Sequence, residues 1–346
     1  MTTKTDVSRR DALAILAGAT AGVLIAGSEA HAEEKKMPPT KFDYDAVIVG
    51  GGPSGLTAAL VLGRACRKVL VCDEGKPRNH TSPAVHGFFS RDGISPAELL
   101  KAGREQLKPY AVEWRDTGVT DAEKVDGGFR VEIRDGKAVT ARKLILATGV
   151  TDERPDIDGL SALWGTGVLH CPYCHGWEVR NKPWGFIARG EQAVEWGVEL
   201  REWTPTLTFC SNGPAGLTDA GRRTLKDRGV VVREEKIKRL DGEKGVLKAV
   251  VFDNGEKLEL TALFVRTTMV QRSPLPKKLG CKLASIEGGF KDAVEADQFG
   301  ATAVPGLYVV GDASRGMPQV ATAVSDGSLA AIMANKAMIK EDAERA

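Results

Sequence analysis

The sequence predicts an α/β protein that contains two parallel-sheet domains. Apolar runs at residues 44–49 and 184–187 each enter a glycine-containing turn that is followed by a helical pattern. A third apolar run, residues 307–310, ends in Gly311-Asp312 far along the chain. Strands that alternate with helices in this way form parallel sheets whose faces are covered by helices.

The composition is that of an ordinary globular protein of about two domains. The 346 residues carry 48 Lys and Arg against 46 Asp and Glu, a formal net charge of +2, and 42% of them are hydrophobic. These values exclude a collagen-like chain, a disordered charged tail and a small disulfide scaffold. The near-balanced charge argues against nucleic-acid binding, which usually needs a basic excess to neutralise phosphates.

Residues 1–32 have the pattern of an export signal. Arg9-Arg10 precedes a mildly apolar run, residues 12–26, which is followed by small residues suited to signal cleavage. The paired arginines resemble the twin-arginine signal, which exports folded proteins, although alanines replace its usual Phe and Lys. The run is shorter than the roughly 20 residues of a membrane span. We therefore expect an exported, periplasmic protein with a leader at 33–41, and an uncleaved anchor or a frayed helix is the alternative.

The first glycine-rich turn predicts a dinucleotide site. The strand at 44–49 is followed by Gly50-Gly51-Gly52-Pro53-Ser54-Gly55 and a helical pattern. Gly50 suits a tight turn, Gly52 lets the backbone approach a pyrophosphate, and Gly55 lets the helix pack on the strand. The positive end of the helix then faces the phosphates. A second strand ends at Asp73, at a spacing suited to a carboxylate that bonds ribose hydroxyls.

Two of the six cysteines, Cys171 and Cys174, form a C-x-x-C pair. Such a pair can close a disulfide reversibly, and a helix N-terminus can lower the pKa of one thiol. Zinc binding is the alternative, but it needs two further ligands at metal spacing. His170 and His175 flank the pair, yet no second C-x-x-C and no H-x-x-x-H is present. The pattern therefore favours redox chemistry and no metal. The remaining cysteines are expected to be buried, inert thiols: Cys66, Cys72, Cys210 and Cys281.

These motifs in this order resemble the low-molecular-weight thioredoxin reductases over residues 44–337. The strand that ends in Thr148-Gly149 and the segment that ends in Gly311-Asp312 resemble further FAD-contacting motifs of flavoproteins with two dinucleotide domains. In glutathione-reductase-like enzymes the redox pair lies inside the first domain and a dimerisation domain follows. The resemblance here implies two Rossmann-like (three-layer ββα) domains, the second inserted in the first, and no C-terminal dimerisation domain.

The resemblance also implies FAD as cofactor and assigns roles around it. Asp312 would bond the ribityl chain of the flavin. Gln319-Val320-Ala321 would begin a helix whose N-terminus faces the isoalloxazine ring, where its positive end stabilises the reduced anion.

The same resemblance assigns the thiol chemistry. Cys174 is implied as the flavin-proximal thiol and Cys171 as the thiol that meets substrate. His175 stands where relatives have an acidic proton donor, and imidazole can exchange protons near neutral pH. A turn-capping role for His175 is the alternative. The string Cys-Pro-Tyr-Cys-His-Gly-Trp-Glu is similar to a subgroup that includes FAD-dependent dithiol oxidases.

The second glycine-containing turn resembles a degraded NADPH site of the pattern G-x-G-x-x-A. Gly190 and Ala193 match that pattern, but Ala188 replaces the first glycine. Glu191 adds a negative charge where an anion should bind. The strand at 206–210 is followed neither by an arginine cluster for a 2′-phosphate nor by an acid for a ribose. We expect NADP(H) binding to be eroded, and a weak but functional site is the alternative.

The predicted boundaries give an FAD-binding domain at 42–152 and 270–340. An NAD(P)-binding-like domain that carries the cysteine pair lies between them, at 155–267. Alternating runs from 230 to 265 are expected to form a β-meander, and residues 267–276 a returning linker.

Taken together, the sequence predicts an exported FAD-dependent thiol–disulfide oxidoreductase that oxidises a dithiol without NADPH. Its expected partners are a small dithiol or a thioredoxin-like protein, with oxygen or a quinone as acceptor. An NADPH-dependent reductase of a thioredoxin-like protein is the first alternative, and a non-catalytic flavin-binding protein is the second. The resemblance implies a homodimer, and the helical segments 96–110 and 321–339 are expected to form core or dimer surface.

Overall fold

The computed structural model describes residues 41–287 and 289–345. The predicted export signal, residues 1–32, and the leader up to Thr40 lie outside the described residues. Among the described residues, no helix combines the length and the apolar character that a membrane crossing requires.

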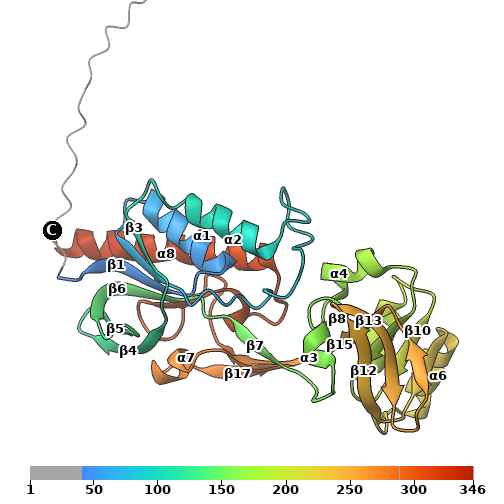
Figure 1. The fold of residues 1–346 in the computed structure, drawn as a ribbon. Helices are drawn as coiled ribbons and strands as arrows, with labels where there is room; N and C mark the ends of the chain where they lie inside the picture. Colours follow the sequence, from blue (N-terminus) through green and yellow to red (C-terminus); the bar gives the residue numbers. More distant parts are fainter. Residues whose placement is uncertain (1–40, 288, 346) are drawn as a thin grey trace, which may run out of the picture. The chain divides into compact units, whose positions relative to one another are not determined.

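The first domain is built on one sheet with the order β3-β2-β1-β6-β5-β4, and β19 also pairs with β6 (Figure 1). Strand β1 is buried along its whole length because all its residues pack between covered faces. It pairs in parallel with β2 and β6, whereas β4, β5 and β6 form an antiparallel meander. The strands are β1 (Tyr44–Val49), β2 (Val69–Cys72), β3 (Val112–Arg115), β4 (Val119–Val125), β5 (Gly128–Ile133), β6 (Ala138–Leu146) and β19 (Leu307–Val309).

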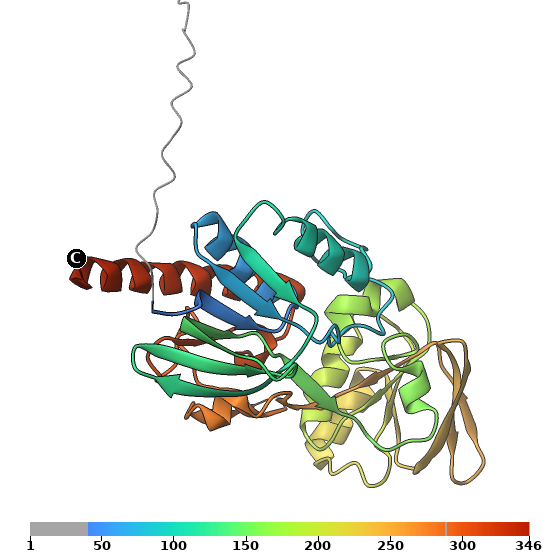
Figure 2. The same ribbon diagram turned by 60° about the vertical axis from the view of Figure 1, so that its left-hand side comes forward.

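Helices α1 (Pro53–Arg64) and α8 (Val320–Arg345) lie against each other on one face of this sheet (Figures 1 and 2). Small buried residues of both helices, such as Ala58 and Ala330, share one core cluster with the strands. Helix α2 (Pro96–Glu105) packs beside α1 and ends sooner than its sequence pattern predicts. Because β19 and α8 come from the far end of the chain, the first domain is made of two separate segments, as predicted.

The second domain lies between these segments in the chain and has a five-stranded sheet of order β11-β10-β9-β15-β8. Every pairing in this sheet is parallel. Its strands are β8 (Val168–Leu169), β9 (Trp184–Ile187), β10 (Leu207–Cys210), β11 (Val230–Arg233) and β15 (Ala262–Val265). Its helices are α3 (Leu160–Leu163), α4 (Pro172–Val179), α5 (Gln192–Leu200) and α6 (Asp219–Asp227).

The β-meander expected from 230 to 265 is shorter than predicted. Only β12 (Ile237–Glu243), β13 (Val246–Phe252) and β14 (Lys257–Glu259) form it, as an antiparallel sheet of their own. Strands β11 and β15 belong to the parallel sheet instead. Ala262–Val265 is a continuous apolar run that is buried throughout, which is typical of a strand covered on both faces and not of a meander strand.

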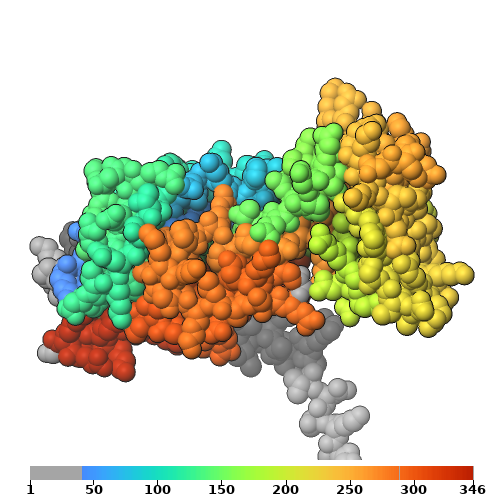
Figure 3. All heavy atoms as spheres, turned by 90° about the horizontal axis from the view of Figure 1, so that it is seen from below, coloured from blue at the N-terminus to red at the C-terminus, as the bar shows by residue number. Residues whose placement is uncertain are grey.

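Antiparallel strands β7 (Val150–Glu153) and β16 (Thr268–Gln271) carry the chain out to the second domain and back. The expected linker at 267–276 is therefore partly a strand. Strands β17 (Leu283–Ile286) and β18 (Phe290–Val294) complete this small sheet. Helix α7 (Leu275–Lys278) packs on β4, where Lys278 pairs with Asp121 at 2.9 Å. Figure 3 shows this orange segment beside the green β4–β5 hairpin. No separate dimerisation domain is present among the described residues.

Three of the four cysteines outside the pair are buried, as expected, and burial raises the pKa of Cys72 to about 11 and of Cys210 to about 12. Burial also raises the pKa of Cys281. The expectation is wrong for Cys66, which is exposed. It follows the end of α1 with φ 59°, a left-handed conformation that turns the chain away from the helix at the surface.

Candidate active site

The turn between β1 and α1 depends on the close approach of backbone atoms. Gly50 has φ 106°, and a Cβ at this position would collide with the carbonyl oxygen of Ala147. A Cβ at Gly55 would collide with the carbonyl oxygen of Gly50. By contrast, a Cβ at Gly52 would meet no atom within 4 Å. Gly50 and Gly55 are therefore needed to close the turn, while Gly52 leaves open space in front of the helix.

That open space lies at the N-terminus of α1. Gly52 is the N-cap residue and provides no side-chain cap, and Pro53 follows it in the first turn. The positive end of the helix is therefore available to an anion such as a pyrophosphate. Asp73, at the end of β2, accepts hydrogen bonds from Gly51 N at 2.9 Å and Gly75 N at 3.2 Å. The carboxylate is thus held beside the turn, where the sequence analysis expects the ribose contact.

A cleft of about 370 Å³ extends from this turn to the C-x-x-C pair. Twelve of the sequence-predicted site residues line it: Gly50, Gly52, Pro53, Ser54, Asp73, Thr148, Gly149, Cys174, His175, Asp312, Gln319 and Val320. The other predicted residues are not part of its lining: Gly55, Cys171, Gly311 and Ala321. Gly311, at the start of the 3-10 helix η1 (Gly311–Ser314), has φ 71°, and a Cβ there would press on Ser54. The absence of a side chain at Gly311 therefore lets η1 lie directly against the side chain of Ser54.

The residues along this cleft fit FAD. Within the described chain, the hydroxyl oxygen of Thr148 is buried and has no hydrogen-bond partner, so it can serve a ligand in the cleft. Gly52 offers an uncovered helix N-terminus for a pyrophosphate. Asp312 lies deeper in the cleft, where burial raises its pKa although Arg78 opposes the shift. Helix α8 begins at Val320 and directs its positive end toward the same cleft.

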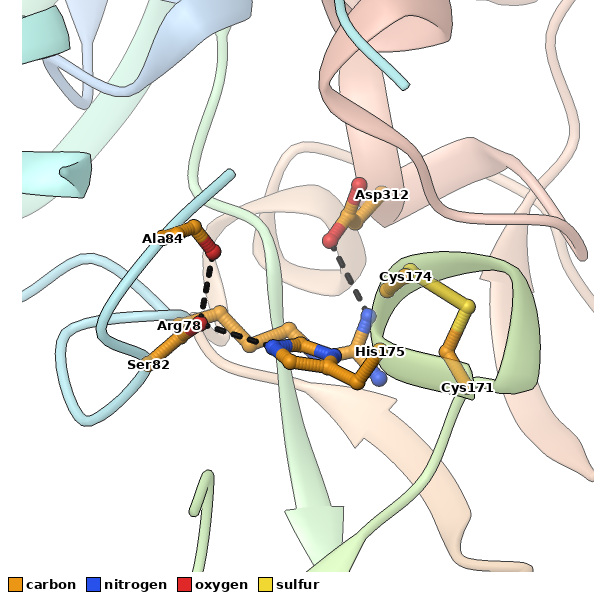
Figure 4. The surroundings of a disulfide bond; sticks show 7 residues. All are labelled: Arg78, Ser82, Ala84, Cys171, Cys174, His175 and Asp312. Atoms are coloured by element: carbon orange, nitrogen blue, oxygen red, sulfur yellow. Dashed lines mark hydrogen bonds and ion pairs between the residues drawn. A yellow bond between two sulfur atoms is a disulfide. The ribbon is translucent and has the colours of Figure 1, made fainter. Parts of the chain in front are cut away.

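Cys171 and Cys174 form a disulfide at the start of α4, with their Cα atoms 5.3 Å apart (Figure 4). Cys171 is the N-cap residue, and Pro172 fixes the first helical position. Cys174 N bonds to Cys171 O at 3.3 Å, which places Cys174 in the first turn. Because Cys174 lines the cleft and Cys171 does not, the two sulfur atoms face different surroundings.

His175 follows Cys174 and is held by the first domain. Its Nε2 lies 2.9 Å from the hydroxyl oxygen of Ser82, and its ring lies edge-on to His86 with 6.2 Å between centroids. Burial lowers the pKa of His175; His86 adds to this effect and Glu178 opposes it. The imidazole is therefore mainly neutral near pH 7.

His170 precedes the disulfide and stacks on Trp164, with 5.8 Å between ring centroids. Burial, reinforced by Arg78, lowers the pKa of His170 to about 4. A neutral, stacked ring serves packing at this position and does not supply a cation. Within the described residues, no group of three or more His, Cys, Asp or Glu side chains is placed to hold a metal ion.

Arg78 is a site residue that the sequence analysis missed. Its guanidinium makes two hydrogen bonds of 2.7 Å to Asp152 on β7 and one of 3.2 Å to Asp312. Thr267 also donates to Asp152, at 2.7 Å. Although burial works against ionisation, Arg78 holds the pKa of Asp152 below its usual value. Arg78 therefore joins a strand that leads to the second domain to the wall of the cofactor cleft.

Ser82 and His86 were also missed, and the reason is the same. All three residues lie between β2 and α2, in a long segment without helix or strand periodicity. A useful signal was present nevertheless, because a long irregular segment inside a compact domain is often functional. This one carries Arg78 and two of the histidines.

In the second domain, carboxylates occupy the turns that would bind a second nucleotide. Glu191 accepts a hydrogen bond of 2.7 Å from Thr218 N, at the N-terminus of α6. Glu234 accepts one of 2.8 Å from Ala215 N and also pairs with Arg222. Backbone amides and an arginine that could meet phosphates are therefore already satisfied by the protein's own anions.

Comparison with known proteins agrees with this geometry. Residues 44–327 match the model of the pyridine nucleotide-disulphide oxidoreductase family. The chain is 31% identical to thioredoxin reductase aclD of Aspergillus oryzae, over 84% of this chain and 94% of that protein. The crystal structure of an oxidoreductase from Agrobacterium tumefaciens superposes with a TM-score of 0.80 at 36% identity, covering 86% of this chain and 98% of that one.

A second similar structure is that of HlmI, with a TM-score of 0.81 at 37% identity over 87% of this chain and 94% of that chain. The family match covers the whole second domain and extends into both segments of the first domain, ending within α8. The protein belongs to the pyridine nucleotide-disulphide oxidoreductase family, and it is an FAD-dependent disulfide oxidoreductase similar to the low-molecular-weight thioredoxin reductases.

Proposed function

We propose that this protein is an exported thiol–disulfide oxidoreductase that oxidises a dithiol through Cys171–Cys174 without using NADPH. The observation that carries the proposal is the hydrogen bond between the Glu191 carboxylate and Thr218 N. Glu191 is the N-cap residue of α5, the helix that follows this turn, and its carboxylate is held beside the turn by its bond to Thr218 N at the start of α6. A nucleotide phosphate at this turn would therefore meet a like charge that repels it. This repulsion favours a dithiol, and not a nicotinamide nucleotide, as the source of electrons.

The chemistry starts at the disulfide. One substrate thiolate attacks the sulfur atom of Cys171, the Cys171–Cys174 bond breaks, and Cys174 leaves as a thiolate. The second substrate thiolate then attacks the substrate sulfur bonded to Cys171, so that the substrate disulfide forms and Cys171 leaves. The substrate loses two electrons and two protons, and the cysteine pair gains both.

His175 serves this exchange as the group that moves a proton. It is next to Cys174, lines the cleft and is mainly neutral near pH 7, so it can accept the proton of an attacking thiol and return it to a leaving thiolate. Bound FAD would supply the two-electron acceptor for the reduced pair and pass the electrons to an acceptor such as oxygen or a quinone. The position of Cys174 on the cleft wall suits contact with that cofactor.

Residues 1–32 support the exported part of the proposal, because their pattern is that of a twin-arginine signal. Such signals carry folded proteins, which suits a chain that binds its cofactor before export. In a periplasm, no NADPH pool is expected, and a dithiol oxidase needs none. The signal-like pattern of residues 1–32 and the Glu191 carboxylate at the nucleotide turn thus both favour a dithiol as the electron source.

The alternative, an NADPH-dependent reductase of a thioredoxin-like protein, has its own support. Gly190 keeps φ 57° in the turn, and relatives such as the Aspergillus oryzae protein bear the name thioredoxin reductase. If this alternative holds, NADPH must reduce the flavin quickly, which the proposal excludes.

The deciding experiment compares three reductants in the absence of oxygen. Purified protein is mixed with dithiothreitol, NADPH or NADH, and the loss of flavin absorbance is followed by stopped flow. We expect saturable bleaching by the dithiol and far slower bleaching by either nucleotide. Under air, each dithiol consumed should yield one hydrogen peroxide if oxygen is the acceptor. Rapid, saturable bleaching by micromolar NADPH would establish the alternative instead.

A further inference from the structure

The contacts of Ser82 determine where His175 carries its proton. The hydroxyl oxygen of Ser82 lies 2.7 Å from the carbonyl oxygen of Ala84 and 2.9 Å from Nε2 of His175 (Figure 4). A carbonyl oxygen can only accept a hydrogen bond, so the single hydroxyl proton of Ser82 is donated to Ala84. The hydroxyl oxygen must then accept the other bond, and Nε2 of His175 must carry a proton and donate it.

This arrangement limits the titration of His175 to its other nitrogen. The cationic ring carries protons on both nitrogens, and the neutral ring bonded to Ser82 keeps the one on Nε2. Nδ1 is therefore the atom that gains and loses the proton. Within the described residues, Nδ1 is buried and has no hydrogen-bond partner, so no protein group competes for its lone pair.

The segment that carries Ser82 is fixed by its own hydrogen bonds. Ser82 N donates to Asn79 O at 3.0 Å. Just beyond Ala84, Val85 and Ile94 form a β-bridge, with Val85 N donating to Ile94 O at 2.7 Å. Ser82 is therefore held in place in the first domain, and it contacts a histidine of the second domain.

We propose that Ser82 is a positioning residue that holds His175 as the Nε2–H tautomer and presents Nδ1 as the base in thiol–disulfide exchange. This inference rests on the proposed function, since it assigns the proton step of the same site. The proton of the attacking substrate thiol moves to Nδ1, and Nδ1 returns it to the thiolate that leaves the disulfide. No proton passes through Ser82, whose own proton stays on the bond to Ala84.

Other charged or titratable groups face His175 and must be considered in any pH profile. His86 comes from the segment after β2, Glu178 from α4 itself, and His170 from the turn before α4. His86 in turn lies 3.6 Å from Asp92 and 3.5 Å from Glu178. A profile measured on Ser82 variants keeps all of these groups unchanged.

The first test observes the tautomer directly. The FAD-bound, oxidised protein is labelled with ¹⁵N-histidine, and the signals of His175 are identified by their loss in His175→Gln. We expect a protonated Nε2 and an unprotonated Nδ1 at neutral pH, and a mixture of both tautomers in Ser82→Ala. A protonated Nδ1 in the neutral ring of the unaltered protein would overturn the inference.

The second test measures kcat/KM for dithiothreitol oxidation against pH in Ser82→Ala, Ser82→Thr and Ser90→Ala. Ser82→Ala should lose about tenfold in kcat/KM at neutral pH, which is less than the roughly 10²–10⁴ that a general base contributes, because the imidazole ring itself remains. The apparent pKa on the acidic side of its kcat/KM profile should also shift. Ser82→Thr keeps a hydroxyl and should recover most of the rate. Ser90→Ala, an exposed serine of the same segment, should match the unaltered protein.

Failure of this inference can be told apart from failure of the proposed function. If the unaltered protein does not oxidise dithiols, the proposed function fails, and the ¹⁵N signals still decide the tautomer. If it oxidises dithiols but Ser82→Ala keeps its rate, its pH profile and a single tautomer, Ser82 has no positioning role and the inference fails.

Discussion

Single residues of the β1–α1 turn have separable roles in folding and in cofactor binding. Gly52→Asp places its side chain in open space at φ −70°, so the protein should still fold. It should lose FAD, because the carboxylate stands where the pyrophosphate meets the helix. The ratio of flavin to protein absorbance measures this loss, and circular dichroism measures the fold.

Two control variants sharpen that prediction. Gly52→Ala adds a small neutral group and should retain part of the FAD. Gly55→Ala should instead destabilise or prevent folding, since its Cβ would collide with Gly50 O. A yellow, fully loaded Gly52→Asp protein would show that the pyrophosphate binds elsewhere.

The two cysteines should differ in their spectra because they differ in position. Cys171→Ser leaves Cys174 on the cleft wall, where its thiolate should give a long-wavelength charge-transfer band with oxidised flavin. Cys174→Ser should give no such band, and both variants should lose dithiol oxidation. Cys66→Ser, which changes an exposed thiol, is the matched control and should change neither property. The opposite order of spectra would reverse the assigned roles.

At the scale of elements, the C-terminal end of α8 is held to the first sheet by buried charges. Arg142 on β6 is almost fully buried and lies 3.0 Å from Glu341 and 2.8 Å from Asp342. Lys143 also pairs with Glu341, and Arg67 pairs with Asp342 at 3.3 Å. Removing one partner of a buried pair leaves the others uncompensated.

Arg142 is buried, but Glu341 and Asp342 are partly exposed. Arg142→Ala should therefore lower the free energy of unfolding by more than the about 1 kcal/mol of an exposed pair, but by less than the about 3–5 kcal/mol of a fully buried one. Urea denaturation of the FAD-bound protein measures this change. Lys248→Ala removes an exposed pair with Glu243 and should cost at most about 1 kcal/mol. Equal, small effects of the two variants would show that the α8 contacts do not stabilise the fold.

The same contacts predict a pH dependence of stability. Burial acts against ionisation of both carboxyl groups. Lys143 and Arg142 nevertheless hold the pKa of Glu341 below its usual value, and Arg142 and Arg67 do the same for the pKa of Asp342. A carboxylate whose pKa is lower in the folded than in the unfolded protein stabilises the fold at pH values above its unfolded pKa. This stabilisation is lost as the pH falls through the folded pKa. The melting temperature should therefore fall steeply below about pH 4. This fall should be smaller in Arg142→Ala, which lacks the main cation that both carboxylates share. An unchanged acid limb in that variant would contradict the assignment.

The elements also show what the sequence could predict. Strands 44–49 and 184–187 were predicted with their observed bounds, because each is a continuous apolar run ended by a glycine turn. The fold class follows from such runs and the glycine spacing. The long irregular segment between β2 and α2 could have been singled out, but Arg78 and Ser82 within it could not, since their partners lie more than 70 residues away. Contacts of that kind come only from the tertiary arrangement.

At the scale of the whole molecule, export is the remaining prediction. A reporter fused behind residues 1–40 should reach the periplasm only when Arg9 and Arg10 are intact, because the twin-arginine route requires the pair. Arg9→Lys/Arg10→Lys should keep the reporter in the cytoplasm, as cell fractionation would show. Export of this double variant would point to the general secretion route. A fusion that lacks residues 1–32 is the negative control.

The bonds of Arg78 couple the strands that connect the two domains to the wall of the cofactor cleft. The chain passes between its two domains along β7 and β16, and Asp152 on β7 is bonded to Thr267 beside β16. Arg78 connects this crossing to Asp312 on the cofactor wall. A twist of one domain against the other would have to move Arg78 and Asp312 together or break their ion pair. The strands that connect the domains and the wall of the flavin cleft are therefore mechanically coupled through Arg78. A displacement of one must displace the other or break the ion pair between Arg78 and Asp312.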